Sequence, residues 1–172
     1  MSTTLFTKKA DKSYRDTTIV GVGNRLLGDE GVGLHIIDGL SQIPMPPNVN
    51  IIDCGCDLLS LTAHIDKPQR IIIIDAVRAG GAPGEIYSFD YNGLTATKVE
   101  MCSAHQVKTV DLLRLSRLLY PALAASEIAV IGVEPKTMRL SPDLSKEVSE
   151  SIAEVTRLVL EGVSRSLHDS AK

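Results

Sequence analysis

The chain has 172 residues, of which 44% are hydrophobic and 23% are charged, a composition typical of one globular domain rather than of a disordered chain. Its 18 Lys and Arg residues against 21 Asp and Glu residues give a formal net charge of −3. Because nucleic-acid-binding domains concentrate positive charge, this balance argues against a protein that binds a phosphate backbone. With no Trp and two Phe, the chain also lacks the aromatic platforms that stack on single-stranded bases.

The ends of the chain carry no targeting pattern. The N-terminal segment has four basic residues but no apolar stretch behind them, unlike a secretory signal. We expect residues 1–16 to form a disordered tail, residues 17–167 to form a single α/β domain, and residues 168–172 to form a C-terminal tail. No stretch approaches the roughly 18 apolar residues that cross a bilayer, and three cysteines argue against a disulfide framework. These features predict a cytoplasmic protein without membrane insertion.

Apolar β-branched runs alternate with segments of helical period along the whole chain. Strands are predicted at residues 18–22, 49–53, 70–75, 85–90 and 127–133. Helices are predicted at residues 31–43, 57–63 and 105–120, and from a start at Ser141-Pro142-Asp143, with Ser141 as N-cap, to residue 167. The strand with four consecutive isoleucines is apolar on both faces, as central strands between two layers of helices are. The alternation predicts a three-layer α/β/α domain with a mostly parallel sheet.

Polar side chains gather where the predicted strands end. Asp29 and Glu30 follow the first strand, Asp53 ends the second, Asp75 ends the third, and His105 opens the helix after the edge strand. Ligands of open parallel sheets bind outside the carboxyl ends of the strands, so we expect these five residues to lie on one rim. Carboxylates with an imidazole suit a metal site or an acid–base site.

Asp75 is the strongest of these candidates. A carboxylate that follows four isoleucines needs a ligand, a cation or a hydrogen-bonding loop, because unpaired burial costs several kcal/mol. Asp29 and Glu30 have a structural alternative, as acids that stabilise a helix start by about 0.3–1 kcal/mol. His105 has one too, as a histidine that makes a local hydrogen bond at the start of its helix.

Cys54 and Cys56 form a C-x-C pair. On an extended segment the two side chains would point to the same face, where soft thiolates bind nickel, zinc or copper. The alternative, which we favour, is two small buried residues, since free cysteine behaves as a small hydrophobe.

Residues 21–33 read G-V-G-N-R-L-L-G-D-E-G-V-G. This string resembles the signature G-x-G-N-x-L-x-x-D-D/E-G-x-G of the hydrogenase maturation endopeptidases, which process nickel–iron hydrogenases. Further blocks follow in the order of that family: Asp53-Cys-Gly-Cys56, Ile74-Asp75-Ala76, Gly81-Ala-Pro-Gly84, Ser103-Ala-His-Gln106 and Ile131-Gly-Val-Glu-Pro-Lys136. The resemblance covers about residues 18–160. One departure is that many relatives have D-G-G-T where this chain has Asp53-Cys-Gly-Cys56.

The resemblance implies a three-layer α/β/α sandwich with a mostly parallel, twisted five-stranded sheet. It also implies an aspartyl-type endopeptidase that removes the C-terminal extension of a hydrogenase large-subunit precursor after nickel insertion. The family's metal-contacting residues fall on Glu30, Asp75 and His105, which we take as the catalytic and metal-binding residues. We expect Asp29 and Asp53 to bind substrate, and Cys54 and Cys56 to be possible extra metal ligands.

The resemblance further implies that the protease has no permanent metal cofactor, because nickel in the precursor serves as the recognition element. The expected partner is therefore a nickel-loaded precursor of a hydrogenase large subunit, and we expect the protease to be a monomer. The metal would polarise the scissile carbonyl, activate a water with a carboxylate as general base, or only position the peptide; the sequence does not distinguish these roles.

Two other classes of protein remain as alternatives. The first is a non-enzymatic nickel-binding or chaperone module that uses Glu30, Asp75, His105 and the C-x-C pair, although the chain has no His-rich tract. The second is a nucleotide-binding α/β domain. Against it, the dinucleotide fingerprint G-x-G-x-x-G fails because Leu26 stands at its third glycine position.

Overall fold

The computed structural model describes residues 16–61, 70–92, 100–102, 114, 117–118 and 120–168. Nearly all of the expected N-terminal tail and most of the helix predicted at residues 105–120 lie outside these ranges. The elements are β1 (Thr17–Gly21), η1 (Gly28–Gly31), α1 (Val32–Leu40), β2 (Val49–Asp53), η2 (Leu58–Ser60), β3 (Arg70–Arg78), β4 (Ile86–Asp90), β5 (Glu100–Met101), α5 (Pro121–Ala124), β6 (Glu127–Val133) and α6 (Lys146–His168). Within the described ranges, no helix is both long and apolar enough to span a bilayer.

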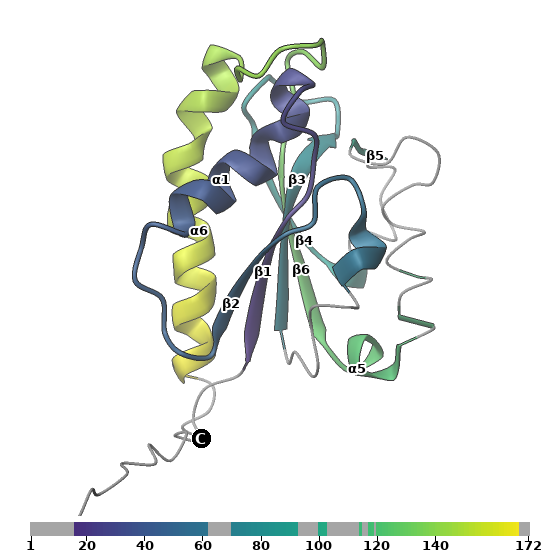
Figure 1. Ribbon diagram of the computed structural model, residues 1–172, viewed down its shortest axis with the longest axis vertical. Helices are drawn as coiled ribbons and strands as arrows, with labels where there is room; N and C mark the ends of the chain where they lie inside the picture. Colours follow the sequence, from purple (N-terminus) through teal and green to yellow (C-terminus); the bar gives the residue numbers. More distant parts are fainter. Residues whose placement is uncertain are drawn as a thin grey trace, which may run out of the picture.

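Five strands form one twisted sheet in the order β2-β1-β3-β6-β4 (Figure 1). β1 pairs in parallel with β2 and β3, β3 pairs in parallel with β6, and β4 runs antiparallel to β6 at the edge. The short β5 pairs antiparallel with the end of β3. The predicted α/β/α fold with a mostly parallel five-stranded sheet is therefore confirmed, and the strand predicted at residues 85–90 is its antiparallel edge.

The four isoleucines of β3 point alternately to the two faces of the sheet. Ile72 and Ile74 belong to the core cluster shared with α1 and α6, which cover one face (Figure 1). Ile71 and Ile73 belong to a second cluster on the other face, which includes residues of η2 and α5. None of the four is more than 2% exposed, and burial of each such side chain stabilises the fold by about 1.5–3 kcal/mol.

The last helix begins later than predicted, at Lys146 rather than just after Ser141. The hydroxyl of Ser141 does accept a hydrogen bond from the N–H of Asp143 at 3.0 Å, as an N-cap would. Its main chain, however, pairs with the loop before η1. The N–H of Ser141 donates to the carbonyl of Leu26 at 2.9 Å, and the N–H of Gly28 donates to the carbonyl of Ser141 at 2.8 Å. These bonds hold Ser141 in a bridge between loops, outside the helix.

The first turn of α1 packs backbone to backbone against the sheet. A Cβ atom at Gly33 would lie 2.3 Å from the carbonyl oxygen of Ile74 and 2.5 Å from that of Val22, so no residue with a side chain fits there. This contact brings η1, which directly precedes α1, to the carboxyl end of β1 and to the part of β3 beside it, next to Asp75.

Two glycines of the same helix should respond in opposite ways to alanine. Gly33→Ala should lower the free energy of unfolding by about 1–3 kcal/mol or more, because the added methyl overpacks a backbone contact. At Gly39 nothing lies within 4 Å of an added Cβ, so Gly39→Ala should raise it by a few tenths to about 1 kcal/mol through helix propensity. Urea unfolding of both variants tests this, and equal changes in stability would contradict it.

Candidate active site

Two buried carboxylates lie at the carboxyl end of the sheet. Glu30, in η1, is 2% exposed, and Asp75, on β3, is 0% exposed. β1 ends at Gly21, which pairs with Ile74, so Asp75 lies one residue beyond the end of β1. The close contact between Gly33 and the carbonyl of Ile74 brings η1 to the same place. The structure thus brings together two residues that the sequence placed on one rim.

β3 does not end at Asp75 as predicted. It continues to Arg78, because its last residues pair with β6 on one side and with β5 beyond it. The carboxylate of Asp75 accepts a hydrogen bond from the N–H of Ala76 at 2.8 Å. Asp75 is therefore positioned by a paired strand rather than by a loop, which suits a side chain that must be held accurately.

Cys56 lies at the exposed side of this carboxylate pair. Its thiol contacts the carbonyl oxygen of Gly23 at 3.4 Å, and the residue is exposed. Partial desolvation raises the pKa of the Cys56 thiol first, and the negative charges of Glu30 and Asp75 raise it further. A Cβ added at Gly23 would clash with the carbonyl oxygen of Glu30, so the loop that the Cys56 thiol contacts packs directly against η1.

Cys54 and Cys56 do not share a face, so the extended C-x-C segment is not observed, and their role as possible extra metal ligands stays a prediction. Gly55 between them has a φ of +50°, which turns the chain where an extended segment was expected. Cys54 is 6% exposed in the core, where burial raises the pKa of its thiol to about 11. Cys54 matches the alternative of a small buried residue, whereas Cys56 is exposed at the rim.

The two thiols should differ in reactivity. We expect an alkylating reagent to modify Cys56 in the folded protein and to reach Cys54 only on unfolding. Because the pKa of Cys56 is raised, little thiolate is present at neutral pH, and alkylation should accelerate only at higher pH. Asp75→Asn removes one of the charges that raise this pKa, so the rate profile of Cys56 should move to lower pH.

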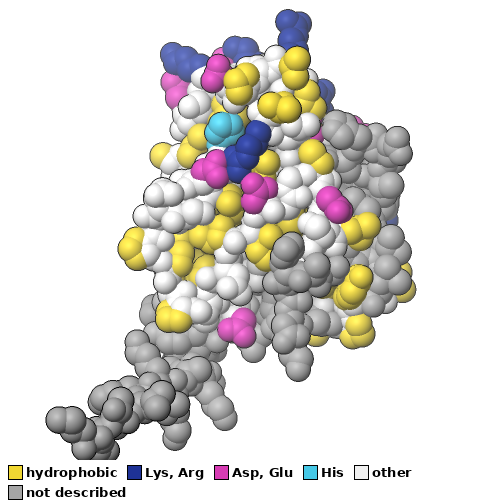
Figure 2. Space-filling view, viewed as in Figure 1, with side chains coloured by type: hydrophobic (Ala, Val, Ile, Leu, Met, Phe, Trp, Pro, Cys, Tyr) yellow, Lys and Arg dark blue, Asp and Glu magenta, His cyan; other side chains and the backbone are white. Residues whose placement is uncertain are grey.

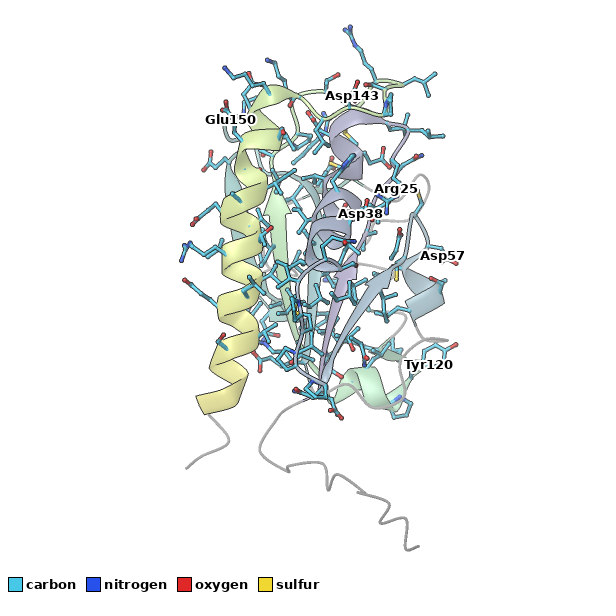
Figure 3. The ribbon with its side chains drawn as sticks, turned by 60° about the vertical axis from the view of Figure 1, so that its left-hand side comes forward. Arg25, Asp38, Asp57, Tyr120, Asp143 and Glu150 are labelled. Carbon is cyan, nitrogen blue, oxygen red and sulfur yellow. The ribbon has the colours of Figure 1, made fainter. Side chains whose placement is uncertain are left out.

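Peptide mapping by mass spectrometry after timed alkylation gives these rates for each cysteine separately. Glu150 on α6 (Figure 3) is exposed and is not among the causes of the Cys56 shift, so Glu150→Gln is the matched control and should leave the profile in place. A profile that Asp75→Asn does not move would show that Cys56 does not face the carboxylate pair.

Asp29 is buried beside Glu30 but binds a different part of the chain. It is 0% exposed. One carboxylate oxygen accepts the N–H groups of Lys136 and Thr137, both at 2.9 Å, and the other accepts the N–H of Ser145 at 2.6 Å. Ser145 directly precedes α6, where the helix dipole favours an anion. Asp29 thus links η1 to the connection between β6 and α6, while its contact with substrate stays a prediction.

Removal of the Asp29 carboxylate should destabilise the fold. Asp29→Ala leaves a cavity at a fully buried position and three part-buried N–H groups without their acceptor, so the free energy of unfolding should fall by more than about 2 kcal/mol. Asp29→Asn keeps one acceptor oxygen, so its free energy of unfolding should lie between those of the wild type and Asp29→Ala. Chemical denaturation measures the change, with the exposed Asp53→Ala as the control, expected to cost less than about 1 kcal/mol. Wild-type stability of Asp29→Ala would contradict this structural role.

Asp53 ends β2 as predicted, but its carboxylate lies at the surface. It accepts hydrogen bonds from the guanidinium of Arg25 at 2.7 Å and from the N–H of Gly55 at 2.8 Å. Arg25 also binds the carboxylate of Asp38 through two bonds, at 2.6 and 3.0 Å (Figure 3). Asp53 therefore belongs to a surface ion cluster next to the buried pair, and its role in substrate binding stays a prediction.

The third predicted site residue, His105, lies outside the described residues. Among the residues that the structure does describe, no three His, Cys, Asp or Glu side chains form a group that could hold a metal ion. Cys102 is the described residue nearest to His105 in the chain. Its N–H donates to the carbonyl of Ala76 at 2.9 Å, and burial, followed by the charge of Asp75, raises the pKa of its thiol to about 11.

Sequence reasoning missed Glu134, a carboxylate that is 7% exposed just after β6. One of its oxygens accepts the N–H groups of Ala79, Gly80 and Gly81 at 2.8, 3.2 and 3.3 Å, and the hydroxyl of Tyr87 at 3.0 Å. Glu134 thereby holds the loop between β3 and β4. The available signal was an acid directly after a buried strand, the same signal that identified Asp75.

The chain matches known proteins of one family. The family model described as hydrogenase maturation protease matches residues 34–162. The Escherichia coli hydrogenase 2 maturation protease is 29% identical over 150 residues, which cover 86% of this chain and 90% of that protein. A protein of Methanocaldococcus jannaschii, also named for hydrogenase maturation, is 30% identical over 151 residues, which cover 85% of this chain and 95% of that protein.

Solved structures give the same result. HybD, a NiFe hydrogenase maturation protease from Thermococcus kodakarensis, superposes with a TM-score of 0.74 at 27% identity, over 86% of this chain and 98% of that one. The hydrogenase maturating endopeptidase HybD of Escherichia coli superposes with a TM-score of 0.73, also at 27% identity, over 87% and 93%. The chain therefore belongs to the hydrogenase maturation protease family, and it is a hydrolase.

Proposed function

We propose that the chain is an endopeptidase that removes the C-terminal extension of a nickel–iron hydrogenase large-subunit precursor. Its family supports a protease in hydrogenase maturation. The observation that carries the site is the pair formed by Glu30 and Asp75, both buried at the carboxyl rim of the sheet. Two nearby carboxylates repel when both are ionised, and a divalent cation offsets that repulsion.

The cation in this proposal is the nickel ion that the precursor carries. The precursor approaches from the side where Cys56 is exposed, and its nickel contacts Glu30 and Asp75. Carboxylates and one imidazole leave coordination positions for the precursor's own ligands, so the ion belongs to the substrate and the protease needs no permanent metal cofactor. Binding then requires both the polypeptide and its metal, which makes cleavage a test of completed nickel insertion.

We include His105 in the site because it follows Cys102 by three residues, and Cys102 is held beside Asp75. The N–H of Cys102 is bonded to the carbonyl of Ala76, the residue after Asp75. Three residues span at most about 11 Å when fully extended. His105 is therefore three residues along the chain from a residue bonded beside Asp75, and an imidazole is a side chain that binds metals and moves protons near neutral pH.

Cleavage of the peptide bond needs an attacking water and a stabilised carbonyl oxygen. In this proposal a carboxylate oxygen of the pair that does not contact the nickel accepts the proton of that water as general base, and the proton then passes to the departing amine. Buried surroundings strengthen the electrostatic effect of both groups on the reacting peptide. The substrate's nickel supplies either polarisation of the carbonyl or an activated water, and both routes use the same placement of Glu30 and Asp75.

A processing assay tests the proposal. A cognate large-subunit precursor is prepared with and without nickel, and mass spectrometry reads its C-terminus after incubation with the protease. We expect a short peptide to be lost from the nickel-loaded form only. Glu30→Gln, Asp75→Asn and His105→Gln should each slow cleavage about 100-fold or more, whereas the exposed Glu150→Gln on α6 should cleave at the wild-type rate.

The possible failures of this assay have different meanings. Near-normal processing by all three site variants would refute the assigned residues. Equal cleavage of nickel-free and nickel-loaded precursor would refute nickel recognition and leave the peptidase activity. Intact precursor in both preparations, with each cognate hydrogenase of the source organism tried, would refute the proposed substrate.

A further inference from the structure

Leu26 and Leu140 are exposed next to each other on the loops beside the carboxylate pair. Leu26 is 61% exposed and Leu140 is 83% exposed. The N–H of Ser141 donates to the carbonyl of Leu26 at 2.9 Å, and Leu27 and Ser141 form a parallel bridge. The two leucines therefore lie on adjacent segments, although they are far apart in sequence.

These two segments are held firmly. Asp29 accepts three backbone N–H bonds that link η1 to the segment after β6, and the N–H of Gly28 donates to the carbonyl of Ser141 at 2.8 Å. Single exposed leucines are common on protein surfaces. Two adjacent ones on a fixed support, the first only four residues before Glu30, form an apolar surface that is already organised for a partner.

Cationic side chains border these leucines. Arg139 precedes Leu140 and is exposed. A second guanidinium, that of Arg78 at the end of β3, contacts the sulfur of Met138 at 3.0 Å, which places it against the same segment. Figure 2 shows basic and hydrophobic side chains at the upper end of the molecule, with acidic side chains at its left edge. We define the tip patch as the following residues: Leu26, Arg78, Met138, Arg139 and Leu140.

We infer that the tip patch is the docking surface for the hydrogenase precursor, and that it receives an apolar segment flanked by acidic side chains. This inference rests on the proposed function. The leucines exclude water from the apolar segment, while Arg78 and Arg139 select for carboxylates. Since the patch continues through η1 to Glu30, a segment bound there sets which peptide bond of the precursor reaches the carboxylate pair.

The test is the double substitution Leu26→Ser with Leu140→Ser, assayed on nickel-loaded precursor. The matched control is Leu118→Ser, because Leu118 is 82% exposed and lies outside the tip patch. All three leucines are more exposed than buried, so all variants should unfold close to the wild-type temperature. For the double variant we expect KM to rise about tenfold or more with kcat within about twofold, and for the control no change.

Charge reversal provides a second readout. Arg139→Glu should raise KM more at low salt than at high salt, because ions screen the repulsion between the new carboxylate and an acidic partner. A double leucine variant with the wild-type KM, or one that loses kcat alone, would overturn the inference. Cleavage by the wild type in the same experiment would still support the proposed function. An inactive wild type would instead refute both together.

The alternative occupant to be tested for this patch is a second copy of the chain. Sedimentation of the wild type and of the double leucine variant distinguishes it from the precursor. A wild-type dimer that the double variant disperses, with cleavage unchanged, would show that the leucines serve self-association and would overturn the inference. A single sedimenting species in both proteins, together with the KM effect, supports precursor docking.

Discussion

The site depends on how closely α1 approaches the sheet. At Gly33 the helix backbone lies so near the carbonyls of Val22 and Ile74 that a methyl group does not fit. A side chain at this position would push the helix off the sheet, hold η1 away from β3 and leave Glu30 apart from Asp75. The glycines of the signature string therefore have a structural cause, since they set the separation at which two carboxylates are buried together.

Four buried carboxylates serve two different purposes around this contact. Asp29 and Glu134 each accept hydrogen bonds from three backbone N–H groups of another part of the chain. These charge-assisted bonds hold two loops in place. Glu30 directly follows Asp29, and Asp75 lies on β3, which leads into the loop that Glu134 holds. The first pair reduces the freedom of the surroundings, and the second pair is thereby positioned for a ligand.

The sequence predicted what depends on local pattern. The boundaries of β2 and β6 agree with the prediction to the residue, and the four isoleucines identified the central strand, because burial on both faces leaves a pattern in the chain itself. The predictions fail where the local conformation is set by contacts with a segment far away in the sequence. The local sequence predicts Ser141 as the N-cap of the last helix, but its main chain bonds to Leu26 and Gly28. Asp29 and Glu30 are neighbours of like charge, and only the fold shows that they face different partners.

The same separation of roles extends to recognition under the proposed function. A pair of carboxylates reports whether a metal is present, but nickel-loaded precursors of different hydrogenases present the same ion, so this pair alone cannot choose among them. Selectivity must come from contacts with the polypeptide. The tip patch meets this need because its loops share the Asp29 link with Glu30, so a polypeptide bound there is held at a fixed position relative to the carboxylates. A correct metal on the wrong chain, or the right chain without its metal, then forms only half of the contacts that cleavage requires.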